Sequence, residues 1–444
     1  FRSARFVLSA HPREIRVLAP RVVEIAENAY DYFSKAYGYH PPTPVRIEFY
    51  RRHEDFSVRT TGLVGVDILG VSFGPVVALD SPSAGVFGPV NFGSTLWHEL
   101  SHSFHLGLTG SRVPRWFSEG LAVFEERRAR PGWGFDVTPE FLIAFREGRL
   151  APASALNQSF LRPSYPEQVV HAYFQGALLM EMIERDHGFE AIVRMLEGYR
   201  DGRSTHELLR EVLALEPDAL DAAFEDFVRE RFGRALEALS PILDSEQGGM
   251  PEGRYPHLLR EARRAMEADG MERAHAALIE AQSLFPEHAG PDSTYSLLAA
   301  LYIKRGDAEL AVDQLKRSIA IDADDLDAHR QLAGLYMENG DPQAAAEIID
   351  RALLIQPFDA TLHRTLAELR ESRDEWRQAA AAREAVVALD PSDPAEARYL
   401  LARAHHRAGE LSAAKREVLG ALEVAPMYEE ALELLLQIRE APDA

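Results

Sequence analysis

The C-terminal half of this sequence repeats itself every 34 residues, which restricts the folds open to it more than any other feature. Small and apolar residues recur at fixed positions: Leu298, Ala299, Tyr302 and Ala311; Leu332, Ala333, Tyr336 and Ala345; and Leu366, Ala367, Arg370 and Ala379. Each unit predicts a pair of helices whose small residues allow a close approach. Because one pair cannot bury its apolar faces alone, the units must stack into an array.

An earlier copy lies at 262–286 and a later one, shifted by one residue, at 401–426, and a last helix is expected at 429–440. The period, the small residues and a proline that closes several copies (Pro286, Pro357, Pro391, Pro426) resemble the tetratricopeptide repeat. The resemblance implies an all-α superhelix of about five repeats with a C-terminal capping helix, and a protein partner bound by the repeats.

The N-terminal half reads differently, as a small sheet followed by helices. Strands are expected at 5–11, 44–51, 63–69 and 75–80, a helix at 12–38, and helical structure from about Phe92 onwards. This order of elements indicates an α+β domain.

A stretch rich in glycine, proline and polar residues at 240–256 indicates a boundary between the two halves. The expected organisation is therefore an N-terminal domain at 1–240, a linker at 241–254 and a repeat domain at 255–444.

Charge and composition exclude several classes of function. The net charge is −22, of which −6 falls on residues 1–240 and −16 on residues 241–444, so a nucleic-acid partner is not expected. No apolar run approaches the length of a membrane span. The chain has no cysteine, so any metal must be held by His, Asp or Glu.

One short motif, His98-Glu99-Leu100-Ser101-His102, carries specific chemistry. On a helix, residues i and i+4 lie on one face, which suits two imidazole ligands of one Zn²⁺ ion. Glu99 lies to the side, where its carboxylate can reach a metal-bound water and act as a general base. Burying two imidazoles and a carboxylate without partners is costly, and a shared metal would satisfy all three.

A third ligand is expected downstream, on a second helix that folds back against the first. Glu119 is favoured, with Glu125 and Glu126 as alternatives that we interpret as part of a solvated face. His105, one turn after His102, is interpreted as a core or surface residue.

These residues resemble the gluzincin zinc metallopeptidases, in particular the peptidase MA-like group related to the aminopeptidase N family. The resemblance rests on His98-Glu99-x-x-His102 followed by Trp116-x-x-Glu119-Gly120-x-Ala122. It implies an α+β thermolysin-like fold for this domain, with His98, His102 and Glu119 as zinc ligands and Glu99 as the base.

A second match, Tyr173-x-x-Gly176, is similar to the helix whose tyrosine stabilises the oxyanion in the aminopeptidase N family. The resemblance gives Tyr173 that role, with a core tyrosine and His171 as a substitute donor left as alternatives. The Gly-x-Met-Glu-Asn segment of those aminopeptidases is missing, and Gly70–Pro75 stands in its place, which favours an endopeptidase.

The sequence thus predicts a zinc-dependent peptidase that hydrolyses peptide bonds, with a peptide or protein substrate lying along an edge strand at 75–80. Two alternatives are a catalytically silent scaffold built on the repeats and a zinc hydrolase for a non-peptide substrate. A bacterial protein of the periplasm or cell envelope is favoured over a cytoplasmic one.

Overall fold

The computed structural model describes residues 1–63, 68–85, 88, 90–241 and 253–440. Its N-terminal half begins with a four-stranded sheet in the order β1-β2-β4-β3. β1, β2 and β4 are parallel, and β3 pairs antiparallel with β4 at the edge. The elements up to the end of the sheet are β1 (Phe6–Ser9), α1 (Ile15–Tyr37), β2 (Val45–Tyr50), α2 (His53–Thr61), β3 (Gly70–Ser72) and β4 (Val76–Asp80).

Helices make up the rest of this half. They are α3 (Phe92–Thr109), α4 (Arg115–Ala129), α5 (Pro139–Arg146), α6 (Asn157–Leu161), α7 (Gln168–His187), α8 (Phe189–Arg200), α9 (Thr205–Val212) and α10 (Pro217–Ala238), with a short 3₁₀ helix at Ala153–Ala155. α1 packs on α3, and α3 packs in turn on α4 and on strands β3 and β4. α3 is therefore the central element of the N-terminal half.

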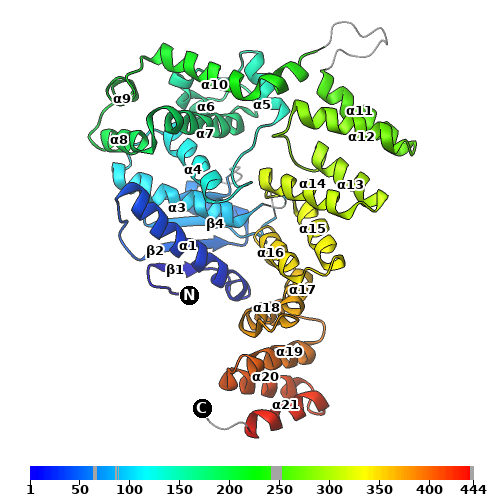
Figure 1. Cartoon of the computed structure of the whole chain (residues 1–444). Coiled ribbons are helices and arrows are strands. Elements are labelled where there is room, and N and C mark those ends of the chain that lie inside the picture. Colours follow the sequence, from blue (N-terminus) through cyan, green and yellow to red (C-terminus); the bar gives the residue numbers. More distant parts are fainter. Residues whose placement is uncertain (64–67, 86–87, 89, 242–252, 441–444) are drawn as a thin grey trace.

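The repeats form five helix pairs and a final helix. The pairs are α11 (Arg254–Glu267) and α12 (Met271–Leu284), α13 (Thr294–Arg305) and α14 (Ala308–Ile321), α15 (Leu326–Glu338) and α16 (Pro342–Ala352), α17 (Ala360–Glu371) and α18 (Trp376–Ala388), and α19 (Pro394–Arg407) and α20 (Leu411–Val424), followed by α21 (Glu429–Glu440). Each pair packs on the next, as the 34-residue period predicts. Figure 1 shows this array running beside the N-terminal half.

The two halves share one hydrophobic core, which extends without a break from Phe6 to Ala382. Their backbones also bond directly. The amide N of Phe92 donates to the carbonyl O of Leu354 at 2.9 Å, and the amide N of Ala323 donates to the carbonyl O of Gly132 at 3.0 Å. The repeats are thus packed against the N-terminal half and contribute to its stability.

The expected helix at 12–38 and the strands at 5–11, 44–51 and 75–80 are confirmed with shorter bounds. Most of the strand expected at 63–69 falls on residues 64–67, which lie outside the described part of the chain. The strand that the structure describes next is β3, which begins at Gly70. The edge-strand role expected for 75–80 is wrong, because β4 lies between β2 and β3.

The expected fold class, an α+β thermolysin-like metallopeptidase domain followed by an all-α superhelix, is not what the structure supports. Helices dominate both halves of the described chain, with 21 α-helices against one sheet of four short strands. The strands have four, six, three and five residues, so the sheet is too small to be the main part of the N-terminal half. The architecture is mainly helical in both halves, and the repeat array makes up the C-terminal half.

Candidate functional site

The helical hairpin α3–α4 brings His98, His102 and Glu119 together. Asn91 caps the N-terminus of α3, where its side chain accepts hydrogen bonds from the amides of Gly93 and Ser94, and Gly110 in a left-handed conformation caps the C-terminus. The short turn that follows returns the chain as α4. His98 and His102 lie one turn apart on the face of α3 that Glu119 contacts.

The ligand atoms of these three residues converge on one point. The Nε2 atoms of His98 and His102 lie 3.3 and 3.2 Å from Oε2 of Glu119. All three ligand atoms lie within 4.8 Å of one another, and among the described residues this is the one group of three or more His, Asp or Glu that meets this criterion. Two imidazole nitrogens and a carboxylate oxygen suit Zn²⁺ better than Mg²⁺ or Ca²⁺, which prefer oxygen ligands.

A surrounding layer of hydrogen bonds orients the three side chains. Nδ1 of His98 lies 2.6 Å from Oε1 of Glu126, and Nδ1 of His102 lies 2.9 Å from Oγ of Ser118. Arg115 donates from Nε to Oε1 of Glu119 at 3.2 Å. Because a carboxylate only accepts, His98 donates from Nδ1 to Glu126, and its Nε2 faces Glu119.

The charges of the cluster stabilise one another. Burial opposes a charge on His98, but the Glu126 and Glu119 carboxylates outweigh it and raise the pKa of His98 well above its usual value. Burial likewise disfavours the charge on Glu119, but His102 and His98 hold the pKa of Glu119 well below its usual range. The cluster is therefore charge-paired, and a metal ion bound by it would replace the proton on Nε2 of His98.

Glu99 lies beside the cluster but is not part of it. Its side chain is buried against strand β3, and its Oε2 has no hydrogen-bond partner among the described residues. A Cβ atom added to Gly70 would lie 2.6 Å from Cγ of Glu99, so the edge strand can lie here only because residue 70 is glycine. Burial is the main cause that raises the pKa of Glu99.

Tyr173 is brought to the cluster by α7, which crosses α4. Its ring centroid lies 6.2 Å from that of His98, and the Phe135 ring stacks on it with a centroid distance of 5.3 Å. Burial and the Glu119 carboxylate raise the pKa of the Tyr173 phenol, so the hydroxyl is a neutral hydrogen-bond donor. His171 lies elsewhere, with its Nδ1 3.0 Å from the hydroxyl of Tyr165.

The interpretation of Glu125 and Glu126 as a solvated face is wrong. Glu125 is fully buried and accepts hydrogen bonds from the hydroxyls of Tyr37 and Tyr32 at 2.6 and 2.9 Å. Glu126 supports His98, a role that the sequence analysis missed. Its position in the sequence could have indicated this role, because Glu126 lies seven residues, or two helical turns, after Glu119. His105 is a core residue, fully buried, with its Nε2 3.3 Å from the Tyr37 hydroxyl.

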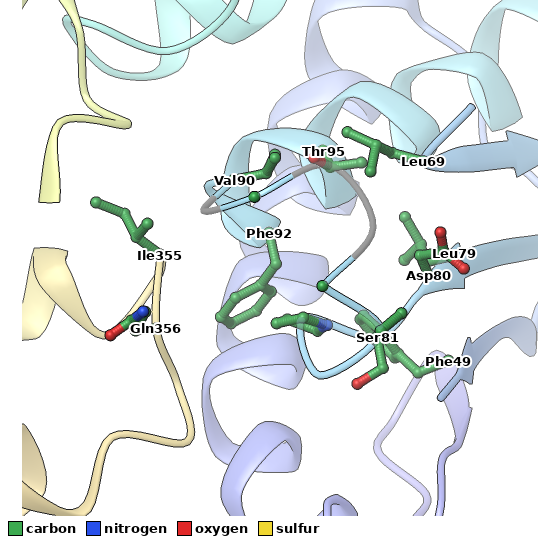
Figure 2. A pocket seen from close by; sticks show the side chains of 14 residues that line it. Phe49, Leu69, Leu79, Asp80, Ser81, Val90, Phe92, Thr95, Ile355 and Gln356 are labelled. Carbon is green, nitrogen blue, oxygen red and sulfur yellow. The ribbon is translucent and has the colours of Figure 1, made fainter. Parts of the chain in front are cut away.

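A separate cavity of about 280 Å³ lies where the carboxyl ends of β2 and β4 meet the repeats. Figure 2 shows Phe49, Leu79 and Phe92 on one side and Ile355 and Gln356 on the other. None of its 14 lining residues belongs to the His98, His102 and Glu119 cluster. This cavity is thus a mainly apolar part of the contact between the two halves.

Comparison with known proteins finds similarity in the repeats. The model of the tetratricopeptide repeat family matches residues 302–369. No curated protein matches the sequence significantly.

Solved structures with local similarity include two that are described as TPR proteins. One is YrrB, described as a TPR protein with an unusual peptide-binding site (18% identity, 40% of this chain and 89% of that one, TM-score 0.30). Others are MamA (18% identity, 43% and 98%, TM-score 0.29) and TTC0263, a thermophilic TPR protein of Thermus thermophilus (22% identity, 42% and 97%, TM-score 0.21).

These findings correct the expected main function. The family match lies in the repeats, so the prediction of a zinc peptidase with the repeats as an accessory is overturned in favour of the alternative, an interaction scaffold. The tetratricopeptide resemblance is confirmed, whereas the gluzincin resemblance finds no support in the comparisons. None of these comparisons tests catalysis or metal binding, so the enzyme assignment stays a prediction.

Proposed function

We propose that this chain is an interaction scaffold that binds a peptide or protein partner on its repeats. The observation that carries the proposal is the way the halves pack. The polar contacts described between them fall on the second helices of the repeat pairs and on the turns that follow. Arg21 bonds to Asp350 of α16 at 2.7 Å, and Arg231 bonds to Glu287 after α12 at 2.6 Å.

The first helices α13, α15 and α17 therefore present a side that the N-terminal half leaves open. We call it the first-helix face and define it by Ala300, Ile303, Arg330, Gly334, Met337 and Arg364. Ile303 and Met337, which lie 34 residues apart, are 41% and 42% exposed. A Cβ atom on Gly334 would meet nothing within 4 Å, so the surface of α15 beside Gly334, one turn before Met337, is open.

Two exposed apolar residues beside small ones suit a partner segment with apolar anchors, and the neighbouring arginines suit polar or acidic flanks. Arg330 is held in place by Gln356 at 3.0 Å and Asp359 at 2.8 Å. A positioned guanidinium loses less side-chain entropy on binding than a mobile one.

The test is selection from a displayed random peptide library on the full chain, followed by affinity measurement on the Ile303→Asp/Met337→Asp double variant. We expect enriched peptides that lose at least ~10-fold in affinity in the double variant, since burying an unpaired carboxylate is costly. Leu419→Asp on the second helix α20, where Leu419 is 42% exposed, is the matched control. Failure to enrich any sequence, or equal binding by the double variant, would refute the proposal.

We also propose that the N-terminal half holds one Zn²⁺ ion through His98, His102 and Glu119. Convergence of the three ligand atoms supports this, as does the buried layer around them. Zinc would add several metal–ligand bonds across the α3–α4 hairpin and so stabilise it. Elemental analysis should find about one zinc per chain, and none in the His98→Ala/His102→Ala variant. If the folded protein took up no zinc, the proposal would be wrong, and the cluster would be only a set of His–Glu ion pairs.

A further inference from the structure

A second cavity, of about 240 Å³, lies at the junction of the two halves and plays no part in the functions proposed above. The N-terminal half contributes the segment after α4 and one side of α7, and the repeats contribute the turn after α12 and the residue after α14. We call it the junction cavity. Its lining includes two acidic residues, two histidines and two phenylalanines: Asp136, Asp322, His171, His288, Phe141 and Phe174.

Carboxyl groups line this cavity. Burial is the main cause that raises the pKa of both Asp136 and Asp322. Asp322, Asp324 and Glu287 also repel a charge on Asp136, against the attraction of Arg127. Glu287 is itself paired with Arg231 at 2.6 Å, and Arg127 lies over the Phe174 ring at 5.7 Å. Arg127 in turn donates to the carbonyl O of Phe135 at 3.1 Å. A charge on Asp136 and Asp322 is thus disfavoured in the empty cavity, and a cation that entered it would favour their charged form.

The two histidines of the cavity supply no compensating charge. Nδ1 of His171 lies 3.0 Å from the Tyr165 hydroxyl, and Nδ1 of His288 lies 2.8 Å from the Tyr255 hydroxyl. Burial lowers the pKa of both imidazoles, so both are neutral near neutral pH. Each ring keeps a second nitrogen with which to contact a ligand.

Aromatic rings form the rest of the wall. Phe141 meets Phe174 edge-on at 4.8 Å and His171 edge-on at 5.8 Å. The face of a phenyl ring attracts a cation, and its apolar area binds the stem of a long side chain. Carboxylates beside aromatic rings are therefore suited to an organic cation.

We propose that the junction cavity binds the guanidinium group of an arginine side chain from a protein partner. A planar guanidinium can stack on a phenyl ring and pair with Asp136 and Asp322 through its several N–H donors, whereas an ammonium is a point charge with stronger hydration. A bare metal ion fits less well, because the acidic and imidazole groups of this cavity do not converge as those of the His98 cluster do.

The inference extends the proposed scaffold function, since it adds one residue type to the partner. It can nevertheless be tested without that partner. The probe is the tripeptide acetyl-Gly-Arg-Gly-amide, and its counterpart with citrulline in place of arginine has the same shape without the charge. Binding of each to the full chain is measured by isothermal titration calorimetry.

We expect the arginine tripeptide to bind at least ~10-fold more tightly than the citrulline tripeptide, because a charged hydrogen bond to a carboxylate is stronger than a neutral one. Asp136→Asn and Asp322→Asn should each weaken the arginine tripeptide by about the same factor. Asp201→Asn, in the exposed turn after α8, is the matched control and should leave binding unchanged.

Equal binding of the two tripeptides, or full affinity in Asp136→Asn, would overturn the inference, as would no detectable binding at millimolar tripeptide. The Ile303→Asp/Met337→Asp variant separates the two proposals. If it loses the library-selected peptides but keeps the arginine tripeptide, both proposals hold. If it also loses the tripeptide, the arginine binds at the first-helix face and the junction cavity does not bind it.

Discussion

Gly120 of α4 and Gly176 of α7 meet backbone to backbone at the crossing of the two helices. A Cβ atom added to Gly120 would lie 2.6 Å from the carbonyl carbon of Gly176, and one added to Gly176 would lie 2.8 Å from Cα of Gly120. The close crossing places Tyr173, one turn before Gly176, beside His98. The glycine of the Tyr173-x-x-Gly176 motif thus sets the distance between two helices that carry the site.

Substitution of Gly176 by alanine should force α4 and α7 apart. We expect the free energy of unfolding to fall by about 1–3 kcal/mol, the usual cost of overpacking a tight contact. Urea denaturation followed by circular dichroism measures the change.

Gly233→Ala is the matched control for this substitution. Gly233 also lies inside a helix, α10, but a Cβ atom there meets nothing within 4 Å. The alanine should stabilise the chain by about 0.5–1 kcal/mol through helix propensity. If Gly176→Ala stabilised the protein in the same way, the close crossing would be an incorrect description.

Removal of the Glu126 carboxylate should weaken zinc binding without removing a ligand. Glu126→Gln replaces the anion that accepts from Nδ1 of His98 with an amide. We expect the zinc dissociation constant to rise ~10–100-fold, as is usual for partners that orient a metal ligand. Competition with a chromophoric chelator measures the constant, and Glu147→Gln on the exposed turn after α5 is the control. Unchanged affinity in Glu126→Gln would show that Glu126 does not orient His98 for the metal.

Local features of this chain could be predicted from the sequence because they depend on periodicity and capping. The 34-residue period predicted the helix pairs, and the i,i+4 spacing predicted that His98 and His102 share a face. The hairpin that returns Glu119 to them follows from the short connection between α3 and α4.

Long-range features could not be predicted in this way. The contact of Phe92 with Leu354 joins residues that are far apart in the chain, and no local pattern encodes it. The sequence also could not tell whether Glu125 and Glu126 face solvent or core. Both fit an exposed helix end until the tyrosines of α1 are placed against Glu125 and His98 of α3 is placed against Glu126. The junction cavity depends on the same long-range packing.

Gly132 is expected to be critical for the contact between the two halves. Its carbonyl accepts from Ala323, its φ is +82°, and an added Cβ atom would lie 2.7 Å from the carbonyl O of Ile319. Gly132→Ala should therefore combine a backbone cost of about 1–2 kcal/mol with a steric cost of about 1–3 kcal/mol. Differential scanning calorimetry should show a lower transition temperature and separate unfolding of the two halves.

Gly148→Ala separates these two costs. Gly148 also has a positive φ, +66°, but a Cβ atom there meets nothing within 4 Å, so only the backbone cost applies. Equal destabilisation by the two substitutions would mean that the contact with the repeats tolerates the extra methyl group.

Stability of the repeats should fall in mildly acidic solution because of His363. Its Nε2 donates to the carbonyl O of Pro357 at 2.8 Å, and its Nδ1 is buried without a partner among the described residues. Burial lowers the pKa of His363 to about 4, whereas an exposed histidine has a pKa of 6.5. Below pH 6.5, His363 is therefore protonated in the unfolded chain but still neutral in the folded chain. The free energy of unfolding falls as the pH falls towards 4. The loss from this residue approaches about 3 kcal/mol at pH 4.

The measurement is the urea midpoint of the whole chain between pH 7.5 and pH 4.5, compared with that of His363→Asn. An asparagine does not titrate in this range, so the variant should lose less stability between these pH values than the wild-type chain. His257→Asn, at an exposed position in α11, is the control and should keep the full pH dependence. If wild type and His363→Asn showed the same dependence on pH, His363 would be protonated in the folded state at no cost, and its buried Nδ1 would have to be accessible to water.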